Sequence, residues 1–296
     1  MDTAIDLPTI HIPSLLRKHH LTPHKGLGQN FLIEDRYLQQ IVQAAEISRG
    51  DKVLEVGAGS GSLTRWLAQV AGQVVAVEMD VQLIPLLKEV IGEGKNIQIV
   101  AGDILQLDPA KLMGSDGYVV AANIPYYITS ALFRHLLEAS AKPSRMVITV
   151  QQEVAERICA EPGELSLLAL SVQVYGTPRA VLNIPASAFY PSPKVDSVTL
   201  RVDLYSQPLI KPSQMDVFFK LSKAGFSQKR KMLHNALAAG LGRTKEEVDA
   251  LLEQAHIDPH RRAQTLNLDE WRSLTELFIS LNQENPSILK DPDKAP

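Results

Sequence analysis

Between residues 51 and 151, short β-branched segments alternate with amphipathic segments, and this alternation constrains the fold more than any other feature of the chain. The β-branched segments span residues 52–56, 73–78, 97–100, 118–122 and 146–150. Apolar residues three and four positions apart predict helices at 36–45, 63–69, 81–90, 130–139 and 153–160. Strands that alternate with helices form a parallel sheet covered by helices. We therefore predict an α/β fold with a Rossmann-like, mostly parallel sheet.

After residue 160 the pattern changes. A helical stretch at 165–174 is followed by two strand-like runs, 180–184 and 197–202, which predict an antiparallel edge of the sheet. Beyond residue 206 only helical periodicity remains, around 214–224, 229–239, 244–253 and 269–281. The predicted organisation is an N-terminal arm (1–34), a sheet domain (35–206), a small all-α domain (207–284) and a tail (285–296).

A glycine-rich turn follows the first predicted strand. Gly57, Gly59 and Gly61 would let a ligand approach the backbone closely. The third glycine comes two residues after the second, whereas the Gly-x-Gly-x-x-Gly turn of nicotinamide and flavin enzymes places it three residues on. This spacing disfavours a nicotinamide oxidoreductase, although a purely structural turn is still an alternative at this point.

Acidic residues mark the ends of the next two strands. Glu78 ends the second strand, where a carboxylate can accept hydrogen bonds from both hydroxyls of a ribose, and Asp103 could accept one from an adenine amino group. Met79 and Ile104, beside them, are apolar enough to sandwich an adenine ring. Either acid alone could be a solvated loop carboxylate. Their succession at strand ends after Gly57 indicates a site for an adenosine-containing ligand, without separating a dinucleotide from an adenosyl compound.

The fourth strand ends in the tetrad Asn123-Ile124-Pro125-Tyr126. The Asn123 amide and the Ile124 carbonyl can both accept hydrogen bonds from an exocyclic amine. Pro125 restricts the turn between strand and site, and Tyr126 offers a flat face to a nucleobase. These groups suit the transfer of a methyl group to the amino group of adenine or a related planar amine.

The composition narrows the expected cellular location and the expected binding partners of the protein. The single Cys159 cannot form an internal disulfide, no run reaches the ~18 apolar residues of a membrane span, and no signal-peptide core is present, so we expect a cytoplasmic protein without membrane contact. With a net charge of −3, binding to a polyanion would depend on local basic patches. Such patches lie at 17–25, 220–231 and 260–262. Each alone could be a solvated face, but three together favour RNA.

Through these residues and the motifs below, the chain resembles the adenine-N6 dimethyltransferases of small-subunit ribosomal RNA along nearly its whole length. Besides the glycine turn and the tetrad, the shared motifs are residues 25–32 (KGLGQNFL), 152–157 (QEVAER), 189–197 (FYPSPKVDS) and 226–231 (FSQKRK). The resemblance implies a class I methyltransferase sheet that binds S-adenosylmethionine. The cofactor residues that it implies are Gln29, Asn30, Leu32, Gly57, Gly59, Glu78, Met79, Asp103, Ile104 and Asn123.

The resemblance further implies dimethylation of the N6 amines of two adjacent adenines in a small-subunit ribosomal RNA hairpin, linked to biogenesis of that subunit. Asn123, Ile124, Pro125 and Tyr126 would hold the target base, and Phe189 would lie near its other face. The helical domain would contact phosphates through Lys229, Arg230 and Lys231. Catalysis would rest on positioning, with no obligatory general base or metal, because the amine can lose its proton after transfer. We expect a monomer.

Two alternatives keep the same fold. The large-subunit ribosomal RNA adenine methyltransferases of the macrolide-resistance type share the glycine turn and the tetrad, whereas the Leu27-Gly28-Gln29 form of the N-terminal motif and residues 226–231 favour the small-subunit family. A ribosome assembly factor that binds without catalysis is the second alternative. One departure from the family pattern, Leu167-Leu168 where a Tyr-Gly pair is usual, lies outside these motifs.

Overall fold

The computed structural model describes residues 7–284, so residues 1–6 of the predicted arm and the predicted tail 285–296 lie outside the described part of the chain. Contacts divide the chain into two compact units. The first takes the residues up to 156 together with 176–204, and the second takes 157–175 together with the residues from 205 onward. Residues 157–175 thus interrupt the first unit in sequence and belong to the second.

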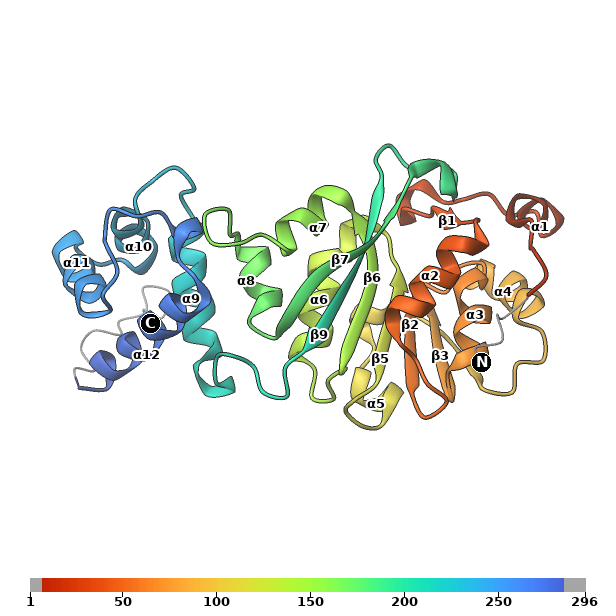
Figure 1. Ribbon diagram of the computed structural model, residues 1–296, viewed down its shortest axis with the longest axis horizontal. Coiled ribbons are helices and arrows are strands. Elements are labelled where there is room, and N and C mark those ends of the chain that lie inside the picture. The colour runs from red at the N-terminus through yellow and green to blue at the C-terminus, as the bar shows by residue number, and fades with distance from the viewer. Residues whose placement is uncertain (1–6, 285–296) are drawn as a thin grey trace, which may run out of the picture. The chain divides into compact units, whose positions relative to one another are not determined.

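A seven-stranded sheet forms the centre of the first unit, with strand order β4-β3-β2-β5-β6-β9-β7 over the described residues (Figure 1). Strands β4, β3, β2, β5 and β6 are parallel, and β9 and β7 add an antiparallel edge. The strands are β2 (Lys52–Val56), β3 (Gln73–Glu78), β4 (Ile97–Ala101), β5 (Val119–Asn123), β6 (Arg145–Gln151), β7 (Gly176–Ile184) and β9 (Ser197–Leu204). The predicted mostly parallel sheet with an antiparallel edge is therefore confirmed.

Helices cover the sheet because the parallel strands are apolar on both faces. The helices of this part of the chain are α2 (Asp35–Ala45), α3 (Ser62–Val70), α4 (Ile84–Ile91), α5 (Pro109–Met113), α6 (Thr129–Glu138) and α7 (Gln152–Ile158). Buried side chains of α2 and α3, such as Ile41 and Trp66, pack in one core with Val53 and Val119 of the strands. Helix α4 begins three residues later than predicted, with a proline in its first turn, where proline is tolerated.

The register of the central strands explains why the site forms where it does. Val56 of β2 pairs with Val77 of β3 on one side and with Ala122 of β5 on the other. The residues that follow these three, Gly57, Glu78 and Asn123, therefore come level with one another at the carboxyl edge of the sheet. Strand β2 lies between β3 and β5, so the turn that follows β2 lies between the ends of these two strands. Open α/β sheets hold ligands at such a point.

Three N-terminal elements were not predicted: α1 (Ile12–Lys18), the 3₁₀ turn η1 (Lys25–Leu27) and β1 (Phe31–Leu32). Strand β1 pairs with the equally short β8 (Phe189–Tyr190), so that Leu32 faces Phe189. Leu16 of α1 and Leu86 of α4 belong to one buried apolar cluster, and Lys18 forms a 2.6 Å ion pair with Glu89 of α4. Elements of two to seven residues carry too little periodicity to be found from sequence.

The second unit is helical, as predicted for the C-terminal part of the chain. Its helices are α8 (Leu167–Gln173), α9 (Met215–Phe226), α10 (Leu233–Leu241), α11 (Lys245–Gln254) and α12 (Leu268–Glu284). The predicted start of α10 at residue 229 was wrong. Residues 229–232 are exposed and form a turn in which the Lys231 N–H donates to the Gln228 carbonyl, because no side chain in this stretch is buried against the unit. The unusual Leu167-Leu168 pair lies in the first turn of α8, which Ser166 caps.

In the described part of the chain, no helix has both the length and the hydropathy to cross a bilayer.

A glycine pair separates the effect of packing from that of backbone conformation. Gly61 and Gly114 both adopt left-handed φ values, 85° and 78°. A Cβ atom at Gly61 would lie 2.8 Å from Leu87 Cδ1, whereas one at Gly114 would meet nothing within 4 Å. We expect Gly114→Ala to lower the free energy of unfolding by about 1–2 kcal/mol. Gly61→Ala should cost a further ~1–3 kcal/mol from overpacking. Urea denaturation measures both, and equal losses would contradict the packing argument.

Candidate active site

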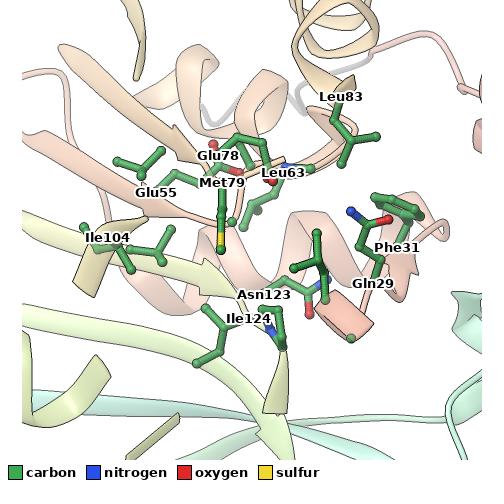
Figure 2. Close-up of a pocket in the computed structure, with 18 of the residues that line it drawn as sticks. Gln29, Phe31, Glu55, Leu63, Glu78, Met79, Leu83, Ile104, Asn123 and Ile124 are labelled. Atoms are coloured by element: carbon green, nitrogen blue, oxygen red, sulfur yellow. Dashed lines mark hydrogen bonds between the residues drawn. The ribbon is translucent and has the colours of Figure 1, made fainter. Parts of the chain in front are cut away.

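A pocket of about 240 Å³ lies at the carboxyl edge of the sheet, in the first unit. The turn after β2, the end of β3, the loop after β4, the end of β5 and residues 27–32 of the N-terminal segment line it. Figure 2 shows Glu55, Glu78 and Met79 on one side, with Asn123 and Ile124 across from them. Gln29 and Phe31 close a third side. Segments that are far apart in the sequence thus meet around one cavity.

The glycine turn brings the walls of the pocket close together. The N–H groups of Gly57 and Ala58 both donate to the Val77 carbonyl, at 2.9 and 3.1 Å, and hold the turn against β3. A Cβ atom at Gly57 would lie 3.6 Å from the main-chain oxygen of Asn123, and one at Gly59 would lie 3.2 Å from the ring of Phe31. The missing side chains therefore allow the turn to approach both the tetrad and the N-terminal segment.

The carboxylate of Glu78 is held firmly at the end of β3. Its Oε2 accepts a hydrogen bond from the Gly59 N–H at 2.6 Å, and its Oε1 accepts one from the Asp80 N–H at 2.8 Å. Burial raises the pKa of Glu78, and these two backbone hydrogen bonds partly oppose the rise. Each oxygen of a carboxylate can accept more than one hydrogen bond. Glu78 can therefore bind ligand hydroxyls without giving up its backbone partners.

Glu55, which received no role from sequence, also lines the pocket. It lies in the apolar strand β2, is 1% exposed, and its Oε2 has no hydrogen-bond partner. Burial raises the pKa of Glu55 to about 8. The Thr64 hydroxyl lowers the pKa by a smaller amount, and the nearby Glu78 carboxylate adds a small further rise. The side chain is therefore mainly neutral at pH 7. An acidic residue within a run of buried apolar residues was the signal that could have identified it.

The loop after β4 contributes the acidic Asp103 and the apolar Ile104. Asp103 Oδ1 accepts a hydrogen bond from the Leu105 N–H at 3.0 Å and thereby begins the 3₁₀ turn η3 (Ile104–Gln106). Ile104 is buried at the pocket wall, while Met79, from the end of β3, is 51% exposed at its rim. The pair offers the apolar surface that a purine ring requires.

The tetrad continues β5 into the pocket. Asn123 Nδ2 points to the main-chain oxygen of Asn30 at 3.5 Å, which orients the amide relative to the N-terminal segment. Ile124 and Pro125 line the same wall. The Ile128 N–H donates to the Pro125 carbonyl at 3.2 Å and closes the 3₁₀ turn η4 (Tyr126–Ile128), which leads into α6. The side chain of Tyr126 lies outside the described part of the structure.

The N-terminal segment is tied across the pocket by the side chain of Gln29. Its Oε1 accepts a hydrogen bond from the His24 N–H, and its Nε2 donates to Asp80 Oδ2, both at 2.7 Å. Asn30 Nδ2 donates to the Gly28 carbonyl at 3.1 Å. The segment is therefore anchored to the end of β3 beside Glu78.

The pocket gathers most of the residues predicted for cofactor and substrate. They are Gln29, Asn30, Leu32, Gly57, Gly59, Glu78, Met79, Asp103, Ile104, Asn123, Ile124 and Pro125. Phe189 does not line it: the ring is 3% exposed within the core that contains Leu32, and contact with a base would require it to rotate out of that core. Lys229, Arg230 and Lys231 are exposed in the second unit. The individual roles of these residues stay predictions.

Sequence reasoning missed several pocket residues besides Glu55. Leu27, Leu83 and Tyr127 line the cavity, and their contribution depends on packing between elements distant in sequence. Over residues 7–284, no group of three or more His, Cys, Asp and Glu side chains is arranged to hold a metal ion.

Comparison with known proteins identifies the family to which the chain is related. The family model described as ribosomal RNA adenine dimethylase matches residues 21–279. A ribosomal RNA small subunit methyltransferase A from Dehalococcoides mccartyi (strain ATCC BAA-2266 / KCTC 15142 / 195) is 45% identical over 273 residues, which cover 92% of each chain. A protein of the same name from Moorella thermoacetica is 39% identical and covers 88% of this chain and 94% of its own.

Solved structures agree with this similarity. A dimethyladenosine transferase from Plasmodium falciparum has a TM-score of 0.73 at 27% identity, covering 85% of this chain and 97% of its own. The 23S rRNA methyltransferase ErmE has a TM-score of 0.68, also at 27% identity, covering 84% and 99%. The sheet described above is thus a class I methyltransferase sheet, as predicted. From the extent of the family match and the identity to these relatives, the chain belongs to the ribosomal RNA adenine dimethylase family.

Proposed function

We propose that this protein transfers methyl groups from S-adenosylmethionine to the N6 amines of two adjacent adenines in a small-subunit ribosomal RNA hairpin. The modification would be part of small-subunit biogenesis, and we propose the cytoplasm as its setting because ribosomal subunits are found there. The observation that supports this proposal most directly is that Glu78, Asp103 and the first three residues of the tetrad, Asn123 to Pro125, line one pocket. Relatives named small subunit methyltransferase A support the choice of subunit.

The pocket fits the proposed cofactor in the chemistry of its walls. Glu78 would accept hydrogen bonds from ribose hydroxyls, and Asp103 would accept one from the adenine amino group; both residues line the pocket. Met79 and Ile104, which also line the pocket, would supply apolar surface on the two sides of a purine. Asn30, Leu32 and the glycine turn would enclose the remainder. When bound, S-adenosylmethionine supplies an electrophilic methyl group attached to a sulfonium.

Catalysis, in this proposal, consists of holding the amine. The lone pair of an adenine N6 is delocalised into the ring, so the nitrogen is a poor nucleophile until it is held in a pyramidal geometry. Asn123 Oδ1 and the Ile124 carbonyl would accept the two amine protons, and Tyr126 would stack on the base. These fixed acceptors would also stabilise the positive charge that develops on the nitrogen. The proton can leave to water after the transfer.

The decisive experiment offers both ribosomal subunits as methyl acceptors. The protein is incubated with labelled S-adenosylmethionine and either undermethylated small subunits or large subunits, and the digested RNA is analysed by mass. We expect dimethyladenosine in small-subunit RNA. Selective labelling of large subunits would instead favour the second candidate, a large-subunit methyltransferase, which the structural similarity to the 23S rRNA methyltransferase ErmE supports. Absence of label from both would favour an assembly factor without catalysis.

The carboxylate of Glu78 should be required for binding of the cofactor. We expect Glu78→Gln to weaken the affinity for S-adenosylmethionine about tenfold to a hundredfold, because the amide loses one charged acceptor for the ribose and for the Gly59 N–H. Isothermal titration calorimetry measures the change. Asp108→Asn is the control, since Asp108 also accepts a backbone N–H, from Ala110, but lies outside the pocket lining. Equal affinities of wild type and Glu78→Gln would contradict the assignment.

The basic turn of the second unit should contribute to RNA affinity through phosphates. We expect replacement of Lys229, Arg230 and Lys231 by alanine to weaken small-subunit binding and to reduce the slope of log K against log salt by roughly 2 to 3. Filter binding at several salt concentrations measures the slope. A control triple variant replaces the exposed Lys95, Lys111 and Arg134 of the first unit. An identical reduction in both triple variants would show only a general charge effect.

A further inference from the structure

Tyr127 is an aromatic side chain that the proposed mechanism does not use. It is 62% exposed, more than the exposed tyrosines 190 and 205, and it lines the active-site pocket. It lies in η4, four residues after Asn123. Its backbone is anchored on both sides, by the Pro125–Ile128 hydrogen bond and by the buried Thr129 that begins α6. The fold therefore presents this ring at the pocket rim, on a short 3₁₀ turn between β5 and α6.

Packing against the N-terminal segment sets the position of the ring. A Cβ atom at Gly28 would lie 3.0 Å from Pro125 Cβ and 3.6 Å from Tyr127 Cε1. One edge of the ring is therefore next to a glycine, while most of its surface faces solvent. A tyrosine that served only to pack the N-terminal segment would be expected to bury more of its surface than this.

We propose that Tyr127 stacks on the nucleotide base adjacent to the target adenine in the RNA substrate. The inference rests on the proposed function and deepens it. A target base reaches the acceptors of the tetrad only by leaving its own stack, which exposes the face of its neighbour. An aromatic ring at the rim can cover that face, and stacking of this kind stabilises bound single-stranded nucleic acid whatever the base.

The proposed substrate explains why an aromatic side chain suits this position better than a hydrogen-bonding one. Two adjacent adenines are modified in turn, so the base on a given side of the target differs between the first adenine and the second. Stacking accepts any base, because every base has a π-face, whereas a hydrogen-bonding side chain would favour one neighbour. A single rim residue can thus serve both adenines.

The test separates stacking from packing by the choice of variants. Tyr127→Phe keeps the ring, Tyr127→Leu keeps only apolar bulk, and Tyr127→Gln is a second non-aromatic variant in case leucine destabilises the fold. Tyr205→Leu, at a partly exposed tyrosine of the second unit, is the control. Each full-length variant is assayed for kcat and KM with undermethylated small subunits and, by calorimetry, for the dissociation constant of S-adenosylmethionine.

We expect Tyr127→Leu and Tyr127→Gln to raise KM for small subunits about tenfold with kcat within about twofold, because the stack forms before the transition state. Tyr127→Phe and Tyr205→Leu should match wild type, and all variants should bind S-adenosylmethionine equally. An unchanged KM in the non-aromatic variants, or a parallel loss of cofactor affinity, would overturn the stacking role alone. A wild-type protein that binds the cofactor but methylates no small subunits would overturn the proposed function, and this inference with it.

Discussion

Asn123→Ala is expected to reduce the methyl-transfer rate at least about a hundredfold while small-subunit binding survives. The substitution removes an oxygen that is held at the end of β5 and oriented by the contact of Nδ2 with Asn30. Loss of one preorganised acceptor typically costs ~3 kcal/mol of transition-state stabilisation. The contact is needed when the nitrogen pyramidalises, so the effect should fall on the rate of transfer and much less on association.

Single-turnover assays with saturating cofactor and undermethylated small subunits measure this rate, and filter binding measures association. Asn183→Ala is the matched control, because Asn183 is an exposed asparagine on β7 of the same unit. Wild-type turnover in Asn123→Ala would remove Asn123 from the mechanism. A variant that no longer binds small subunits would show that Asn123 acts on RNA binding instead.

The wild-type protein is expected to lose stability as the pH rises from about 5 to 8. Glu55→Gln is expected to remove most of this loss. Below pH 4.5 the carboxyl is protonated in both the folded and the unfolded chain. Between pH 4.5 and about 8 the unfolded chain has lost this proton while the folded chain keeps it, so a rise in pH favours unfolding. The expected slope is about 1.4 kcal/mol per pH unit, or about 4 kcal/mol over the range.

Urea denaturation of the ligand-free protein at pH 5, 6, 7 and 8 measures this dependence. Glutamine keeps the size of the side chain and cannot ionise, so the curve of the variant should be flatter. A smaller decline should persist, because burial also raises the pKa of Glu78. Glu93→Gln, at an exposed position, should reproduce the wild-type curve. Parallel curves for wild type and Glu55→Gln would mean that Glu55 is already ionised in the folded protein at these pH values.

The pattern of strands and helices, with the residue types at the strand ends, was sufficient to locate the central part of the site. The predicted strands end at Val56, Glu78 and Ala122, and parallel pairing brings the next residues to one edge regardless of how the helices pack. For this reason the sequence alone assigns Gly57, Glu78, Asp103 and Asn123 to one site. The helical nature of the C-terminal part was predictable on the same basis, because its apolar residues repeat with helical spacing.

Other features were decided only by the tertiary structure. The pairing of Leu32 with Phe189 joins two strands of two residues each, and it explains why the Phe189 ring is buried in the core instead of lining the pocket. The protonation of Glu55 depends on complete burial, and the exposure of Tyr127 depends on how η4 meets Gly28. Periodicity records which face of an element is buried. It carries no information about contacts between segments far apart in the chain, and those contacts set burial, pKa values and the rim of the pocket.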